Sequence, residues 1–442
     1  MTCQNPIYIA AQRRPFIAQR VDAPSILAPP DLWISCIVAV RLQLKPHAML
    51  YALRPRKRIF CLLEIPSASA FPMPTALAAV LYESGKPLVI EEVEVLPPQA
   101  GEVLVRMKAA GVCHSDLHVM KGDLPMPTPI ILGHEGAGIV EAVGPSVISV
   151  APGDHVIPIW RSSCGRCDFC QQGRPALCDL GTAMRFTGLM PDGKTRFRNS
   201  RGDSILHYAG VSTFSSMSTM PEGAVVKIDP DFPLWKAALI SCGVITGIGA
   251  VTHAAQVRLG ATVAVFGCGG IGLNIIQGAR MISARQIIAV DTVAGKERHA
   301  RVMGATHFID SSTCDPVKAI KELTGGLGAE FTFEAIGLPE PIEQAFDSLR
   351  KGGTCVVTGI SRGDARARIN TNQLLYAEKT LKGSLYGSMR PRIDLPRLMD
   401  LHQTGALKLD ELLTRTWRLD EINEAYAALE RGEVARSLIV WD

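Results

Sequence analysis

The chain has 442 residues, of which 47% are hydrophobic and 20% are charged, and its formal net charge is +4. This length exceeds what one hydrophobic core normally serves, so we expect two domains. No uninterrupted apolar run approaches the roughly 20 residues of a membrane-spanning helix, so we expect no membrane partner. Basic residues are not clustered in the main body of the chain, which argues against a nucleic-acid partner.

Residues 1–74 differ in composition from the rest of the chain. All 40 glycines lie at Gly85 or later, and this opening segment has nine Lys and Arg against three Asp and Glu. It shows no sustained helical or strand periodicity. Three interpretations remain open: a transit-type segment, a disordered tail, or upstream sequence before a true initiator at Met73. We favour the last, because a strand pattern begins directly afterwards, and we assign the segment no function.

Alternating apolar and polar residues predict β-strands in the stretch that follows. We expect strands over residues 75–82, 88–95, 102–107, 138–143 and 155–158. Proline and glycine residues between them mark turns. The sequence therefore predicts an antiparallel barrel or sandwich over this part of the chain.

From about residue 244 the pattern changes to short apolar runs separated by glycine turns and helical stretches. Strands are expected over residues 262–266, 286–290, 307–309, 331–333, 354–358 and 380–385. This alternation is the signature of a doubly wound parallel sheet, so the fold class is α/β. The tail has a helical pattern over 422–429 and a strand pattern over 437–441, which we assign back to the first, β-rich domain.

A glycine-rich loop follows directly after the strand over residues 262–266. It opens a helix, expected over 273–281, and it reads Gly267-Cys268-Gly269-Gly270-Ile271-Gly272. This context indicates a dinucleotide site: Gly267 permits the tight turn, Gly269 lets the backbone approach a pyrophosphate, and Gly272 lets helix and strand pack closely. Asp291 lies nineteen residues past the last glycine. Its carboxylate would accept from ribose hydroxyls and repel a 2′-phosphate, which indicates NAD rather than NADP.

Thiol and imidazole groups gather in the short span of residues 111–138. A zinc ion that does chemistry takes three protein ligands and keeps one position open. Cys113 and His134 supply two ligands, and Cys242 is the best remaining thiol for the third. A lone cysteine is more often a small buried hydrophobe, and a lone histidine is usually a hydrogen-bonded residue. Their combination with the cofactor loop favours a catalytic zinc site.

Four further cysteines fall within fifteen residues and predict a second metal site: Cys164, Cys167, Cys170 and Cys178. Four thiolates close a tetrahedral shell with no open position, so this site would be structural. The alternative is a set of free thiols or local disulfides. The twelve cysteines of the chain do not resemble a disulfide framework. They favour a reducing compartment, which we take to be the cytoplasm.

With these elements in family order, residues 75–442 resemble the zinc-dependent alcohol dehydrogenases of the medium-chain dehydrogenase/reductase superfamily. The matching motifs are Cys113-His-Ser-Asp, Gly133-His-Glu, the four-cysteine lobe, Cys242 before Gly-x-x-Thr-Gly, and the nucleotide fingerprint. The resemblance implies a GroES-like catalytic domain of residues 75–243 and 386–442, interrupted by a Rossmann NAD-binding domain of residues 244–385. It also implies two zinc ions per chain, reversible hydride transfer from a primary or aryl alcohol to NAD, and a homodimer or homotetramer.

The same resemblance assigns roles around the catalytic zinc. Glu135 would lie behind the metal and ligate it transiently, and Asp116 would orient His134. Ser115 and His118 match the positions of a proton relay from the alcohol to solvent. The remaining assignments are Trp160 at the substrate pocket, His114 and Arg436 at the pyrophosphate, Thr246 and Ile271 at the nicotinamide, and Lys296 beside Asp291 at the adenosine ribose.

Two alternative functions remain open. The stretch of residues 180–214, together with His114, is similar to glutathione-dependent formaldehyde dehydrogenases, which oxidise adducts such as S-(hydroxymethyl)glutathione. However, the segment between His118 and His134 has one acid, Asp123, whereas that branch carries more acidic charge there. We therefore favour a primary or aryl alcohol. The second alternative is an inactive nucleotide-binding relative, although such relatives typically lack the zinc thiols that are present here.

Overall fold

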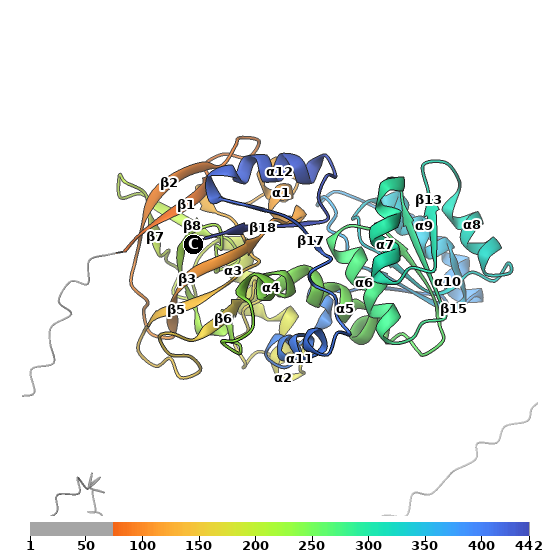
Figure 1. The fold of residues 1–442 in the computed structure, drawn as a ribbon, viewed down its shortest axis with the longest axis horizontal. Helices are drawn as coiled ribbons and strands as arrows, with labels where there is room; N and C mark the ends of the chain where they lie inside the picture. Colours follow the sequence, from red (N-terminus) through yellow and green to blue (C-terminus); the bar gives the residue numbers. More distant parts are fainter. Residues whose placement is uncertain (1–73, 442) are drawn as a thin grey trace, which may run out of the picture. The chain divides into compact units, whose positions relative to one another are not determined.

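A computed structural model describes residues 74–441 of the chain. The expectations for the opening segment, whether transit peptide, tail or sequence before an initiator at Met73, lie outside these residues. The described part contains a β-rich domain and a parallel-sheet domain (Figure 1). Both kinds of domain agree with the prediction.

The β-rich domain is built from a closed barrel and a seven-stranded sheet. The barrel strands, in spatial order, are β1 (Thr75–Leu81), β2 (Val89–Val95), β7 (Phe197–Arg198), β8 (Ser204–His207) and β4 (Ile130–Ile131). The sheet has the order β10 (Val225–Lys227), β6 (His155–Pro158), β5 (Ala137–Val143), β3 (Glu102–Gly111), β18 (Arg436–Val440) and β17 (Leu413–Trp417), with β9 (Met217–Pro221) also paired to β3. All five strands expected from the alternation are present. The strands that the sequence did not reveal are mostly too short to show a period.

Helices lie between these strands. They are α1 (His114–Lys121), α2 (Asp168–Gln171), α3 (Asp179–Thr187), α11 (Pro391–Gln403) and α12 (Ile422–Glu430). Helix α1 carries four of the candidate site residues: His114, Ser115, Asp116 and His118. The C-terminal strand pairs with the sheet of this domain: β18 pairs antiparallel with β3, and the backbone N–H of Val112 donates to the Ser437 carbonyl (3.0 Å). Figure 1 shows this blue strand beside the orange β3. This pairing brings Arg436 next to the residues that follow β3.

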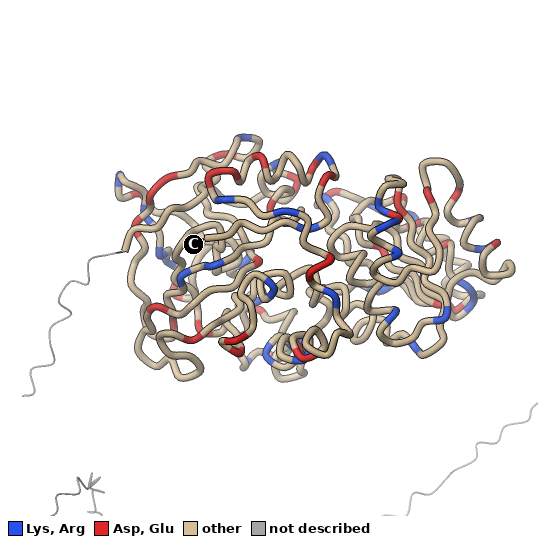
Figure 2. The backbone as a smooth tube through the Cα atoms, viewed as in Figure 1, with Lys and Arg blue, Asp and Glu red and all other residues tan. Residues whose placement is uncertain are grey.

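The second domain is a six-stranded parallel sheet. Its order is β13 (His307–Asp310), β12 (Gln286–Asp291), β11 (Thr262–Phe266), β14 (Ala329–Glu334), β15 (Leu349–Val357) and β16 (Thr380–Gly383). The helices are α6 (Gly270–Met281), α7 (Glu297–Met303), α8 (Pro316–Leu323), α9 (Pro339–Asp347) and α10 (Thr371–Tyr376). The direction of strand order reverses between β11 and β14, and ligands bind at such a point beyond the carboxyl ends of the strands. Figure 2 shows charges of both signs interspersed over the described chain. The strand β11 contains no charged residue, and all five of its residues are buried.

A continuous helical segment crosses the expected domain boundary at residue 244. It comprises α4 (Leu234–Leu239), a π-helical turn (Ile240–Val244), α5 (Ile245–Gly249) and a second π-helical turn (Ala250–Ala255). The sequence analysis missed this apolar stretch, which is long and apolar enough to cross a membrane by length and composition alone. Its most apolar window is 83% buried within the protein, so its packing is that of a core helix. The boundaries at 243/244 and 385/386 stay predictions.

His207 is a buried histidine at the end of β8. Its Nε2 accepts the backbone N–H of Arg196 (2.9 Å), and its ring contacts Phe197. Burial, aided by the charge of Arg196, lowers the pKa of His207 to about 3. The unfolded chain has an imidazole pKa of about 6.5. Between these values only the unfolded state binds the proton, so stability falls as pH drops through this window.

We expect the substitution His207→Gln to flatten this pH dependence, because glutamine keeps an acceptor for the Arg196 N–H and does not titrate. Between about pH 7.5 and pH 5, the free energy of unfolding should fall by about 2 kcal/mol more in the wild type than in the variant. Urea unfolding at a series of pH values measures the difference, with His299→Gln on α7 as the control. Parallel pH profiles for wild type and His207→Gln would contradict the prediction.

Candidate metal and cofactor site

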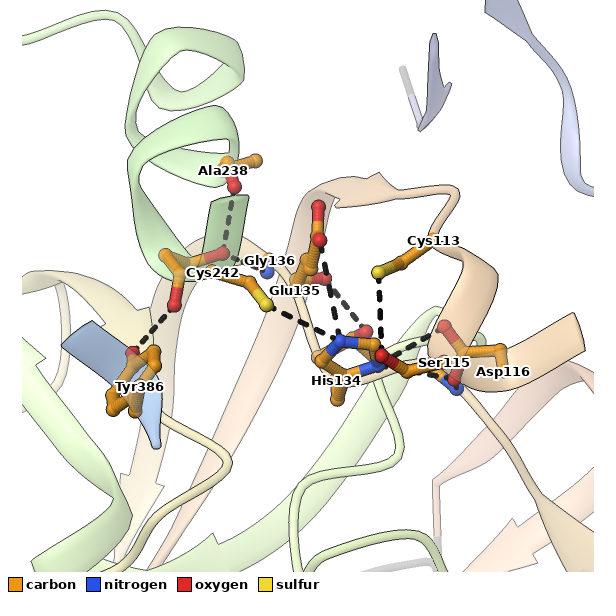
Figure 3. A network of polar contacts seen from close by, with 12 residues as sticks. Cys113, Ser115, Asp116, His134, Glu135, Gly136, Ala238, Cys242 and Tyr386 are labelled. Atoms are coloured by element: carbon orange, nitrogen blue, oxygen red, sulfur yellow. Dashed lines mark hydrogen bonds and ion pairs between the residues drawn. The ribbon is translucent and has the colours of Figure 1, made fainter. Parts of the chain in front are cut away.

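The three predicted ligands of the catalytic zinc meet in space. Ligand atoms of Cys113, His134, Glu135 and Cys242 all lie within 4.8 Å of one another, and all four residues are buried. His134 Nε2 is 3.5 Å from Cys242 Sγ. Figure 3 shows the two thiols on either side of the His134 ring. A set of two thiols, one imidazole and one carboxylate suits zinc.

Asp116 contacts the imidazole ring of His134. The Oδ1 atom of Asp116 lies 3.1 Å from His134 Nδ1 and accepts the backbone N–H of Gly133 (3.0 Å). Gly133 has φ +85°, and a Cβ there would lie 2.5 Å from the backbone nitrogen of Phe214. The contact with Asp116 occupies Nδ1, and Nε2 faces Cys242 Sγ. The orienting role of Asp116 toward a bound metal stays a prediction.

Cys242 lies in the π-helical turn Ile240–Val244, which the sequence analysis did not foresee. π-helical turns inside α-helices are frequent at functional sites. The turn is held from both sides: the backbone N–H of Gly136 donates to Ser241 Oγ (3.1 Å), and the hydroxyl of Tyr386 donates to the Ser241 carbonyl. These contacts, visible in Figure 3, connect the turn to the His134 loop.

The electrostatics of the cluster favour a thiolate at Cys113. A hydrogen bond with Cys242 lowers the pKa of the Cys113 thiol well below its ordinary value despite burial, and the charges of His134 and Arg436 act in the same direction. Burial raises the pKa of Glu135 to about 7, against the opposing charge of Arg436. Thiolate is the form of cysteine that binds metal. Glu135 Oε1 is buried without a hydrogen-bond partner, so it remains available to a metal.

Arg436 connects the metal cluster to the start of the cofactor helix. It forms a buried ion pair with Glu135, and a Cβ on Gly270 would lie 2.7 Å from its Cδ atom. The bare backbone at Gly270 therefore allows the arginine to approach α6. Its expected place beside the exposed His114 at a pyrophosphate stays a prediction.

The cofactor loop has the geometry that its glycines predict. Gly267 has φ +94°, and a Cβ on Gly272 would lie 1.7 Å from the Gly267 carbonyl oxygen, so only glycine allows this helix–strand approach. A Cβ on Gly269 would meet no atom within 4 Å, which leaves room for a pyrophosphate at the start of α6. Asp291 ends β12 and pairs with Lys296 (3.0 Å). These residues fit NAD.

The predicted nicotinamide, relay and pocket residues lie around the same cluster. Thr246 is buried on the turn after Cys242, and half-buried Ile271 is the second residue of α6. Ser115 Oγ is 3.6 Å from Cys113 Sγ, and His118 Nδ1 is 3.1 Å from Asp123 Oδ2. None of these contacts by itself tests the assigned roles.

Two aromatic rings contact His134 and a third packs on one of them, and only one of the three was predicted from the sequence. The centroids of Trp160 and Tyr208 lie 5.9 and 5.7 Å from that of His134. Tyr386 packs on Trp160 at 5.2 Å. Tyr208 and Tyr386 come from segments with no motif, so no signal in the sequence could have found them. The rings give the metal cluster an apolar, aromatic surrounding.

The four cysteines of the second cluster also converge. The sulfur atoms of Cys164, Cys167, Cys170 and Cys178 all lie within 4.8 Å of one another, and none is in a disulfide. Backbone N–H groups of Arg166 and Cys167 donate to Cys164 Sγ and lower the pKa of that thiol to about 6. This disfavours the alternative of local disulfides and fits a closed zinc site.

Comparisons with known proteins agree with this arrangement. A model described as "Alcohol dehydrogenase GroES-like domain" matches residues 99–230, and one described as "Zinc-binding dehydrogenase" matches residues 270–404. The chain is 42% identical over 366 residues to the NDMA-dependent alcohol dehydrogenase of Amycolatopsis methanolica, covering 82% of this chain and 98% of that one. It is 40% identical over 373 residues to the S-(hydroxymethyl)glutathione dehydrogenase of Saccharomyces cerevisiae, covering 83% and 96%. The crystal structure of benzyl alcohol dehydrogenase from Acinetobacter calcoaceticus superposes with a TM-score of 0.79 at 34% identity, covering 84% of this chain and 100% of that one.

A GroES-like domain that carries a cysteine–histidine cluster, together with a Rossmann domain, defines a zinc-binding dehydrogenase. The chain belongs to the zinc-dependent alcohol dehydrogenases of the medium-chain dehydrogenase/reductase superfamily. It is therefore an oxidoreductase that acts on small alcohols or aldehydes. The predicted family, fold class and enzyme class are confirmed.

Proposed function

We propose that the enzyme transfers a hydride from a primary or aryl alcohol to NAD and releases the aldehyde, reversibly. The observation that carries this proposal is the convergence of Cys113, His134 and Cys242 within 4.8 Å of one another, a cluster that Arg436 joins to the start of α6. The second, four-cysteine cluster would hold a structural zinc. Because every thiol of both clusters is in place, an inactive nucleotide-binding relative is the weaker hypothesis.

The proposed reaction uses one set of residues to hold the metal and another to carry the proton. Bound zinc would supply Lewis-acid polarisation of the substrate oxygen, and bound NAD would supply the hydride acceptor. Cys113, His134 and Cys242 would hold the metal and leave one position open, with Glu135 behind it. Ser115 would take the hydroxyl proton and pass it toward His118, which releases it to solvent.

The surroundings of the cluster favour an alcohol over a glutathione adduct. Trp160 and Tyr208 pack against His134, and Tyr386 packs on Trp160, so the cluster has an aromatic surrounding that suits an aryl or alkyl group. The one acid between His118 and His134 is Asp123, and it already contacts His118. It is therefore not a free partner for the amine of a thiol adduct. The formaldehyde dehydrogenase activity stays the alternative because named relatives include S-(hydroxymethyl)glutathione dehydrogenases.

A substrate panel tests this proposal. The purified enzyme is given NAD with benzyl alcohol, ethanol, or formaldehyde with and without glutathione, and reduction of the nicotinamide is followed by absorbance. We expect kcat/KM for benzyl alcohol to exceed that for the glutathione adduct by at least about tenfold. One buried group or a few apolar contacts change the ratio of kcat/KM between two substrates by about this factor. A clear preference for formaldehyde with glutathione would instead establish the alternative.

The cofactor preference is expected to depend on the charge of Asp291. The two carboxylate oxygens of Asp291 accept from the backbone N–H groups of Cys268 and Val293. Asparagine keeps one of these two acceptors, and it removes the charge that would repel a 2′-phosphate. We expect Asp291→Asn to lower the ratio of kcat/KM for NAD over NADP by about tenfold, which corresponds to about 1.4 kcal/mol. Asp310→Asn is the matched control, because Asp310 lies opposite Asp291 at the end of β13. An unchanged ratio would remove Asp291 from cofactor selection.

We also propose a homodimer or homotetramer that assembles through the β16 edge of the parallel sheet. All four residues of β16 are exposed, as are Leu375 and Tyr376 on the neighbouring α10. An unpaired edge strand with exposed apolar residues is a natural surface for pairing with a second chain.

The free thiols and thiol clusters of residues 74–441 favour a reducing compartment, and we propose the cytoplasm.

A further inference from the structure

At the end of α1, the relay residue His118 contacts Asp123, a residue to which no role in the reaction has been given so far. His118 Nδ1 lies 3.1 Å from Asp123 Oδ2. Residues five apart do not face each other along an α-helix. The contact exists because the helix stops between them, which makes it a specific feature of this turn.

The backbone alone builds the turn. The helix ends at Gly122, which has φ +81°, and the N–H of Gly122 donates to the carbonyl of Val119 (3.1 Å). The N–H of Leu124 then returns to the carbonyl of His118 (3.1 Å). This is a common helix stop at a left-handed glycine. Because none of these bonds uses the Asp123 side chain, the carboxylate is not needed to form the turn.

The charged residues near this pair form ion pairs with other partners, so Asp123 pairs with His118. Lys121, the nearest cation in sequence, pairs with Glu430 instead, and Asp116 is committed to His134. Within residues 74–441, no other basic side chain forms an ion pair with Asp123. The side chains of His118 and Asp123 are 28% and 27% exposed, so the pair lies where a proton can pass to water.

We propose that Asp123 is a positioning residue for proton release, acting through His118. Its carboxylate accepts the Nδ1–H of His118, which fixes the ring and keeps the Nε2 lone pair free. For each alcohol oxidised, the hydride passes to NAD and one proton passes through Ser115 to His118 Nε2. The Nδ1–H bond and the Asp123 carboxylate remain unchanged, and the imidazolium then gives its Nε2 proton to water.

This inference rests on the proposed relay. A double-mutant cycle separates the positioning role of Asp123 from the relay role of His118. The readout is the rate constant for proton release in the first turnover, measured with a pH indicator, together with KM for NAD and alcohol. We expect His118→Gln to slow proton release by about tenfold or more. Asp123→Asn keeps an acceptor oxygen but removes the carboxylate charge. It should slow proton release by about fivefold, the scale of the strength that the charge adds to one hydrogen bond, with both KM values within about twofold of wild type.

The combined variant distinguishes positioning from other effects. In the His118→Gln background, Asp123→Asn should change the rate by less than about twofold, because the group through which it acts is gone. Asp123→Glu should recover part of the wild-type rate, and the exposed Asp364→Asn serves as a control. A normal rate in Asp123→Asn, or an equal loss in both backgrounds, would overturn the role of Asp123. Full activity in His118→Gln would overturn the relay itself.

Discussion

Replacing Cys113 with serine is expected to remove one of two zinc ions per chain and to lower kcat/KM for alcohol oxidation by at least about 10³-fold. A serine hydroxyl stays neutral near pH 7, whereas the surroundings of Cys113 already favour the thiolate that zinc requires. Loss of the Cys113 thiolate leaves two of the proposed zinc ligands, His134 and Cys242, whereas a catalytic zinc takes three protein ligands. Metal analysis of the purified variant and steady-state kinetics measure the two effects.

The control for this substitution is Cys355→Ser, which alters another buried thiol, on β15 and outside both clusters. That variant should keep two zinc ions and an activity close to wild type. The cofactor site should survive in Cys113→Ser, because Gly267 and Asp291 are held by contacts of their own. NAD binding measured by calorimetry therefore separates loss of metal from loss of fold. Retention of both zinc ions in Cys113→Ser would contradict the assignment of Cys113 as a ligand of the catalytic zinc.

The second large effect is expected from Cys178→Ser in the four-cysteine cluster. Residues 164–175 contain no buried residue, so apolar burial does not hold this lobe in place. Nearby, the buried Arg161 donates to the carbonyls of Ala176 and Gly181 on either side of Cys178. Loss of a structural zinc removes several kcal/mol, which lowers the melting temperature of a domain of this size by about 10 °C.

Thermal unfolding and metal content check this prediction together. The variant should keep one zinc ion, because the catalytic ligands are untouched, and it should unfold at the lower temperature whether or not a chelator is present. The wild type should fall to the same temperature only after prolonged chelation. Cys314→Ser, at an exposed thiol, is the control. A Cys178→Ser variant with wild-type metal content and melting temperature would show that the lobe does not depend on a closed metal site.

The parts of the fold that could be predicted are those encoded by local patterns. The spacing of Cys164, Cys167 and Cys170 constrains their thiols to one small loop, and the loop from Gly267 to Gly272 needs glycine at positions that the backbone geometry explains. The central strands β11 and β12 of the parallel sheet could be predicted because buried strands are short, continuous apolar runs. In each case the signal lies within about fifteen residues.

The parts that could not be predicted depend on contacts between distant segments. Nothing in the sequence around Tyr386 shows that its hydroxyl reaches Ser241, and the π-helical turn at Cys242 has no residue pattern of its own. The ion pair between Glu135 and Arg436 joins residues 301 positions apart. The contact of His118 with Asp123 is local, but it appears only once the helix is known to stop at Gly122.

The unbroken helical segment from Leu234 to Ala255 has a mechanical consequence. Cys242 and Thr246 lie four positions apart on it, across the junction of the π-helical turn and α5. One proposed metal ligand and one proposed nicotinamide contact therefore belong to the same helical segment. Their separation is fixed by the backbone of that segment.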